Sequence, residues 1–93
     1  MNKIELRFDK AQTCLAGFPY GKSVYEQQVE GKIDADGAVE IVFPSQIEMV
    51  ASSFVQGFFS VLVKQIGYLG IERNIKIVSA SESLTQSICE NLY

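Results

Sequence analysis

The stretch ASSFVQGFFSVLVKQIG, residues 51–67, decides the fold class of this chain. At 100° per residue, its polar side chains fall on one narrow helical stripe, and apolar side chains cover most of the remaining circumference. A helix with so wide an apolar face must pack between a sheet and other elements. The residues of the polar stripe are Ser53, Gln56, Ser60 and Lys64.

Both ends of this helix carry sequence signals. Ser53 and Gln56 have the spacing of a capping box, so Ser53 is predicted to be the N-cap. Gly67 supplies a stop signal. The aromatic residues between them lie on the apolar face, which favours core packing over a surface that stacks nucleic-acid bases. They are Phe54, Phe58 and Phe59.

Strands are predicted on both sides of this helix. Val39–Phe43 is rich in β-forming residues, and Pro44 ends it, followed by a loop up to residue 50. Ile75–Val78 has the same character. Residues 3–8 alternate between polar and apolar, which is typical of a half-buried strand.

Two further helices are predicted from capping-box spacings. Ser79 and Glu82 precede a last helix, whose predicted core residues are Leu84, Ile88 and Leu92. Ser23 and Glu26 indicate a helix over residues 24–33. For that segment a β-hairpin is the alternative, with Tyr25–Ile33 as its first arm, because Asp36-Gly37 is a strong turn signal.

The order β-(α)-β-α-β-α predicts a single α/β domain over residues 1–93. Alternation at this spacing favours right-handed crossovers and a mixed sheet with helices packed on it. A chain of 93 residues with 47% hydrophobic content buries one modest core.

Charge and composition exclude several classes of function. Eight Lys+Arg against eleven Asp+Glu give a net charge of −3, and the basic residues are scattered, so a nucleic-acid partner is not expected. The most apolar stretch, residues 49–63, is too short and too polar for membrane insertion, and the first residues lack the apolar segment of a secretory signal. We therefore expect a cytoplasmic protein in which Cys14 and Cys89 are free thiols.

No catalytic residue, cofactor or metal site is expected. The chain contains no histidine, which is the commonest general base and metal ligand, so nothing of that kind could activate Cys14. The Asp34-Ala-Asp36-Gly37 stretch lacks the remaining ligand spacing of a calcium loop. The glycines Gly17, Gly21 and Gly31 are too widely spaced to cradle a phosphate. The protein is therefore predicted not to be an enzyme.

The segment from Val39 to Leu92 resembles the STAS-like domain family, which is related to the sulphate-transporter and anti-sigma-factor-antagonist domains. The resemblance rests on the strand 39–43 leading through a short loop into Ala51-Ser52-Ser53-Phe54, and on Gly57-Phe58-Phe59 within the helix. It also rests on Ile75-Lys76-Ile77-Val78-Ser79, an acidic-polar turn and a last helix. The turn Pro19-Tyr20-Gly21 is similar to the family's N-terminal half.

The resemblance implies a regulatory role for the start of the central helix. In anti-sigma-factor antagonists an Asp-Ser-Ser-Gly run opens the equivalent helix, and its first serine is phosphorylated by a kinase that is also the binding partner. By position, Ser52 matches the first serine and Ser53 the second. Here Ala51 replaces the aspartate and Phe54 replaces the glycine, which puts phosphorylation in doubt more than the fold or the docking surface.

The expected function is a non-enzymatic protein-interaction module that docks a regulatory protein of the kinase-like ATPase kind. The expected site consists of Ser52, Ser53, Gln56 and Ser60. A phosphate on either of the first two serines would add about −1.5 to −2 charges, which a docked partner would have to desolvate or repel. The simpler interpretation of Ser53 is that it only caps the helix.

Two alternatives remain open from the sequence. One is a sensor that binds a nucleotide or another anion at the same helix N-terminus, because backbone N–H groups there attract negative charge. The other is a structural homodimer joined through a continuous sheet or through the region of Phe8, Phe18 and Tyr20.

Overall fold

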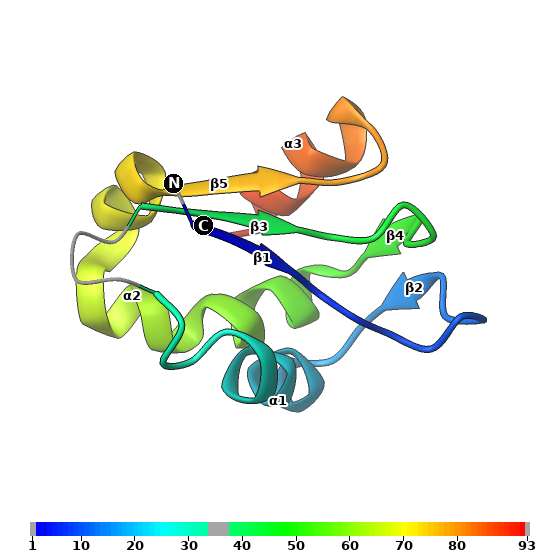
Figure 1. Cartoon of the computed structure of the whole chain (residues 1–93), viewed down its shortest axis with the longest axis horizontal. Coiled ribbons are helices and arrows are strands. Elements are labelled where there is room, and N and C mark those ends of the chain that lie inside the picture. Colours follow the sequence, from blue (N-terminus) through cyan, green and yellow to red (C-terminus); the bar gives the residue numbers. More distant parts are fainter. Residues whose placement is uncertain (1, 34–37, 93) are drawn as a thin grey trace.

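Three parallel strands form the main sheet in the spatial order β1-β3-β5 (Figure 1). They are β1 (Asn2–Glu5), β3 (Val39–Val42) and β5 (Ile75–Val78), in a computed structural model that describes residues 2–33 and 38–92. The register places Ile4 beside Ile41 and Ile41 beside Ile77. These side chains share the face that the helices cover.

The strand predictions at Val39–Phe43 and Ile75–Val78 are confirmed. The first strand is shorter than the predicted 3–8, although the Leu6 N–H still donates to the Val42 carbonyl at 2.9 Å. The sequence predicted a mixed sheet, and every strand pair in the described residues is parallel. The connections within the main sheet pass through helices, which is the arrangement that parallel neighbours require.

A second, two-stranded ladder lies where the main strands end (Figure 1). It consists of β2 (Cys14–Leu15) and β4 (Met49–Val50), which pair in parallel. The prediction of a loop up to residue 50 is therefore wrong for its last two residues. The Ala51 N–H donates to the Leu15 carbonyl at 2.8 Å, so this ladder leads directly into the central helix.

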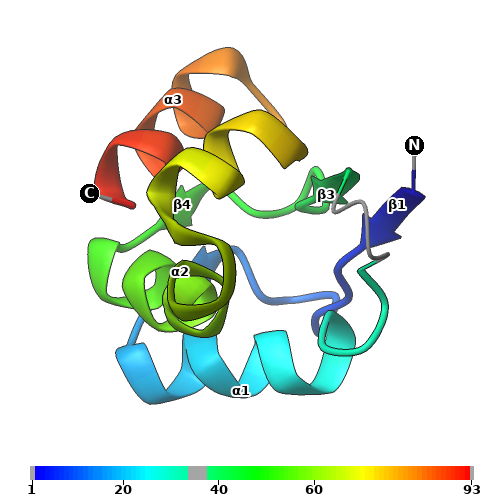
Figure 2. The same ribbon diagram turned by 90° about the vertical axis from the view of Figure 1, so that its left-hand side faces the viewer.

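The described residues form three helices, which complete the α/β fold. α1 (Phe18–Gln28) and α2 (Ser52–Asn74) lie on one side of the main sheet, and α3 (Glu82–Asn91) packs beside β5 and the second half of α2 (Figure 2). On the described elements, the opposite face of the sheet carries no helix. The predicted α/β class with helices packed on a sheet is confirmed.

α1 settles the choice that the sequence left open between a helix and a hairpin. The segment is helical up to Gln28, so the hairpin is wrong, and the helix runs from Phe18 to Gln28 rather than from residue 24 to residue 33. Pro19 occupies the first turn, where its fixed φ suits a helix start and its missing N–H costs nothing. Ser23 is therefore inside the helix, where its Oγ accepts from Gln27 Nε2 at 3.3 Å. The predicted turn at Asp36-Gly37 lies outside the described residues.

α2 differs from its prediction at both ends. Its N-cap is Ala51 rather than Ser53, and no side chain caps it. Gly67 does not end the helix: it forms a kink with φ 71° and ψ 172°, and helical structure resumes up to Asn74. One residue in a conformation that is nearly restricted to glycine therefore turns the helix without ending it.

α3 has the predicted core face but a different cap. The Leu84 N–H donates to Ser81 Oγ at 3.1 Å, so Ser81 rather than Ser79 is the N-cap. Ser79 lies two residues too early and instead hydrogen-bonds Thr85 Oγ1 at 2.7 Å. Ile88 and Leu92 are buried, and Leu84 packs against the core from a half-buried position.

The core forms around the aromatic side chains of α2. Phe54, Phe58 and Phe59 are at most 1% exposed, which confirms that they are core residues. Phe58 is at their centre, with ring centroids 5.9 Å from Phe54 and 4.9 Å from Phe59. Burial of three phenylalanines supplies a large share of the apolar area that stabilises so small a domain.

By length and composition alone, α2 is apolar enough to cross a membrane. Its phenylalanines are buried in the core, however, and Gly67 kinks it. The core helix of a soluble protein passes the same test. The fold is therefore compatible with a soluble protein.

Candidate functional site

Glycines allow α1 and α2 to cross at very short range. A Cβ on Gly57 would collide with the Phe18 carbonyl group, and a Cβ on Gly21 would collide with the Phe54 carbonyl group. The two backbones are therefore in direct contact, which only glycine permits. This contact places the start of α1 against the first turns of α2, where the expected site lies.

A hydrogen bond ties the two helix starts together. The Gly17 N–H, just ahead of α1, donates to Ser53 Oγ at 2.9 Å. Gly17 has φ 101°, a backbone conformation that favours glycine. Ser53 is half-buried, so its hydroxyl serves the α1–α2 contact rather than capping its own helix.

The other expected site residues lie along the same side of α2. Ser52 and Gln56 are exposed, whereas Ser60 is half-buried and its Oγ donates to the Gly57 carbonyl at 2.7 Å. Ser52 is the first residue of α2, where free backbone N–H groups and the helix dipole favour negative charge. A phosphate on Ser52 would therefore be tolerated by the domain itself.

Gln56 and Ser60 line a surface depression that we call the α2 groove. Its cavity volume is about 300 Å³. Its lining residues are Phe18, Gln56, Ser60, Val63, Lys64, Tyr68 and Leu92. The predicted polar stripe thus becomes one wall of a concave surface, which α1 and the end of α3 complete.

Exposed aromatic rings accompany the polar groups in this groove. Phe18 and Tyr68 are each 45% exposed, although aromatic side chains in a domain of this size usually gain stability from burial. Aromatic side chains beside amide, hydroxyl and ammonium groups are typical of the centres of protein interfaces. The sequence did not single out Tyr68, because the helix was predicted to end at Gly67, one residue before it, whereas helical structure continues to Asn74.

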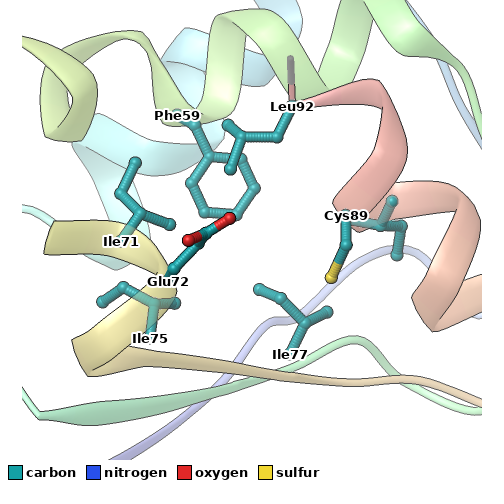
Figure 3. Close-up of a pocket in the computed structure, with 8 residues that line it drawn as sticks. Phe59, Ile71, Glu72, Ile75, Ile77, Cys89 and Leu92 are labelled. Atoms are coloured by element: carbon teal, nitrogen blue, oxygen red, sulfur yellow. The ribbon is translucent and has the colours of Figure 1, made fainter. Parts of the chain in front are cut away.

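A second cavity lies between α2, β5 and α3 (Figure 3). Its volume is about 220 Å³, and most of its lining is apolar. The lining residues are Phe59, Ile71, Glu72, Ile75, Ile77, Ile88, Cys89 and Leu92. Ser52 and Ser53 line neither this cavity nor the α2 groove, so neither cavity supports an anion site at the start of α2.

The thiol at this cavity is poorly suited to nucleophilic chemistry. Cys89 points towards Ile77 in Figure 3, and burial raises the pKa of its thiol. A raised pKa keeps the thiol protonated at neutral pH, and the thiolate is the reactive form. Cys14 and Cys89 are both free. Within residues 2–33 and 38–92, no group of three or more metal-ligating side chains comes together.

The Ser53–Gly17 bond leads to a prediction about stability. Replacing Ser53 by alanine leaves the half-buried Gly17 N–H without this acceptor, so we expect the free energy of unfolding to fall by about 1–2 kcal/mol. Ser52→Ala, at the exposed position next to Ser53, should change the free energy of unfolding by less than about 0.5 kcal/mol. Urea denaturation of both variants measures the difference. Equal effects would show that Ser53 has no structural role.

Comparison with known proteins gives one match. A family model described as "STAS-like domain of unknown function (DUF4325)" matches residues 20–85. No curated protein and no solved structure matches the chain significantly. The matched segment covers well over half of the chain and includes α2 with Ser52, Gln56 and Ser60.

Proposed function

Because the chain belongs to the family of STAS-like domains, a membership that the sequence resemblance anticipated, we propose that it docks a regulatory protein on the α2 groove and the adjoining Ser52. Membership supports a general regulatory or interaction module. The specific surface is our proposal, and the observation that carries it is the concave groove with two exposed aromatic rings.

The composition of the α2 groove suits a polypeptide partner better than a small polar substrate. Phe18 and Tyr68 offer apolar area that a partner can bury, and Gln56 and Lys64 offer donors that orient it. Lys64 is the charged group of the lining, so an acidic or carbonyl-rich segment is the favoured complement. Catalysis is not part of the proposal.

Phosphorylation of Ser52 is proposed as the switch. Its side chain is exposed, whereas the Ser53 hydroxyl accepts from Gly17 and is half-buried. A kinase therefore reaches Ser52 without disturbing the α1–α2 contact. The resemblance to anti-sigma-factor antagonists supports a kinase-like ATPase as the partner, although Ala51 and Phe54 differ from the residues that flank the serines there.

A small-ligand sensor is the second candidate function, and the apolar cavity of Figure 3 is the observation that favours it. Dry apolar cavities of about 150 Å³ in proteins bind molecules the size of benzene. A cavity of about 220 Å³ would accept a small apolar molecule rather than a nucleotide. A ligand that binds only the folded state raises the melting temperature, so a thermal-shift screen tests this candidate.

The docking proposal predicts loss of a partner when charge is placed at Ser52. In a quantitative pull-down from native cell extract, Ser52→Glu should capture at least about tenfold less of the specific partner than wild type, because the added carboxylate is desolvated at the interface. Ser52→Ala should retain it. Ser83→Glu is the matched control, since Ser83 is also an exposed serine in the first turn of a helix.

Circular dichroism establishes that every bait is folded. A protein that is lost with Ser52→Glu and with Gln56→Arg, but retained by the Ser83→Glu control, identifies the partner of this surface. Equal capture by all baits would show that the start of α2 is not the docking surface.

A further inference from the structure

β1 forms one edge of the main sheet, and no described strand lies beyond it (Figure 2). The Leu6 N–H donates to Val42 on β3, and backbone groups alternate in direction along a strand. The N–H and C=O groups of Ile4 therefore also face β3, and those of Lys3 and Glu5 face away from the sheet. Lys3 and Glu5 are thus the residues that a further strand could pair with.

The open part of this edge has a defined end. The next outward-facing residue is Arg7, whose N–H donates to Gln28 Oε1 at 2.7 Å and whose carbonyl accepts from Gln28 Nε2 at 2.9 Å. The Gln28 side chain, at the end of α1, thus occupies both backbone groups of Arg7. Among the described residues, this edge is protected at Arg7 and open at Lys3 and Glu5.

We propose that a second copy of this chain pairs antiparallel with this edge, about a two-fold axis through Ile4, so that the sheet continues across both subunits. In that register Lys3 lies opposite the partner's Glu5, and Glu5 lies opposite the partner's Lys3. Each of these pairs exchanges backbone hydrogen bonds, because both residues direct their N–H and C=O groups outward. This goes beyond the proposed function, and it leaves the α2 groove free.

Charge complementarity makes a second copy the favoured occupant of the edge. The Lys3 and Glu5 side chains share the uncovered face of the sheet, are 56% and 67% exposed, and lie 3.3 Å apart as an ion pair. Across the axis each charge meets its opposite, and opposite charges directly across an antiparallel pair are stabilising. An unrelated strand would need the same alternation of charge, which this chain already supplies.

The inner face of the same edge offers a contact for the apolar residue at the axis. A groove lined by Ile4, Glu5, Arg7, Gln28 and Lys32 runs beside β1, with a cavity volume of about 420 Å³. The partner's Ile4 would enter this groove against Ile4. Because the paired segment is short, the interface is smaller than that of a permanent dimer, and we expect reversible association.

Sedimentation equilibrium tests the pairing, at protein concentrations from about 10 µM to about 1 mM, where small interfaces associate. Wild type should show a monomer–dimer equilibrium. Glu5→Lys and Lys3→Glu each place like charges opposite one another at both symmetry-related pairs, so each should weaken the dimer about tenfold or more. The double variant Lys3→Glu/Glu5→Lys restores opposite charges and should restore the dimer. Lys10→Glu, in an exposed loop, is the matched control for charge.

Amide hydrogen exchange provides a second readout that does not depend on any variant. Protection of the Lys3 and Glu5 amides should rise with protein concentration, while that of the Ile4 amide, already directed at β3, should not change. A monomer over the whole concentration range would overturn the proposal. So would a dimer that the single charge reversals leave intact, because its interface would lie elsewhere.

Discussion

Gly57→Ala is expected to lower the free energy of unfolding by about 3 kcal/mol or more. The added methyl group would overlap the Phe18 carbonyl oxygen and would lie 2.8 Å from its carbonyl carbon. Both atoms belong to the backbone of α1, so no side chain can move aside to make room. The helices would have to separate, and the Ser53–Gly17 hydrogen bond and the ring contacts of Phe54 and Phe58 would be disturbed with them.

The sign of this effect makes the test sharp. Inside an ordinary helix, replacing glycine by alanine stabilises by roughly 0.5–1 kcal/mol. Chemical denaturation of Gly57→Ala should therefore show a lower free energy of unfolding than wild type, whereas helix propensity alone predicts a higher one. Gln56→Ala, at the neighbouring exposed position, should stay within about 0.5 kcal/mol of wild type. A stabilised Gly57→Ala would contradict the close crossing of α1 and α2.

Gly67→Ala is expected to lower the free energy of unfolding by about 1–3 kcal/mol. Apart from the adjacent backbone, no atom lies within 4 Å of a Cβ placed on Gly67, so the cost comes from the backbone conformation alone. At φ 71° and ψ 172° an alanine is strained, because this region is nearly restricted to glycine. Relief of that strain would straighten α2 and move the turn that carries Tyr68 and Ile71.

This substitution also connects the fold to the candidate site. Tyr68 lines the α2 groove and Ile71 lines the apolar cavity, so both surfaces depend on the direction of α2 after Gly67. Urea denaturation measures the stability change, with Gln65→Ala as the control on the same helix. If Gly67→Ala were more stable than wild type, Gly67 would have to adopt an ordinary helical conformation, which would contradict the kink in α2.

Elements with strong local patterns were predictable from the sequence. Val39–Phe43, Ile75–Val78 and the buried face of the central helix have apolar patterns that, with their lengths and flanking residues, favour one type of structure. The capping-box spacings were less reliable. Ser23, Ser53 and Ser79 each have the spacing, but none is an N-cap, because Gly17, Ala51 and Ser81 occupy the N-cap positions instead. A capping box is a local signal that tertiary contacts readily override.

The features that the sequence did not predict depend on contacts between distant residues. β2 and β4 have two residues each, which is too short for any periodicity, and they form because Leu15 and Val50 meet in space. The role of Ser53 could not be predicted because its partner, Gly17, lies 36 residues away. The groove arises only where α1 crosses α2, so Gln56 and Ser60 were identifiable as a polar stripe but not as part of a concave surface.

The open edge of β1 was likewise only partly predictable from the sequence. Alternation over residues 3–8 predicted the strand, but only the sheet order shows that it lies at an edge. The bonds between Gln28 and Arg7 show where that edge is closed. The proposed docking groove and the proposed dimer interface lie on different parts of the fold and can be tested independently.

Site-specific photocrosslinking tests the docking claim most directly. A photoreactive amino acid would replace Gln56, whose side chain is exposed in the α2 groove, and in a separate variant would replace Gln86, an exposed residue on α3. After irradiation in native cells, the account predicts one discrete protein adduct from position 56, absent from position 86 and lost when Ser52→Glu is added. If position 56 gives no adduct, or one that Ser52→Glu leaves unchanged, the α2 groove is not a switchable docking surface.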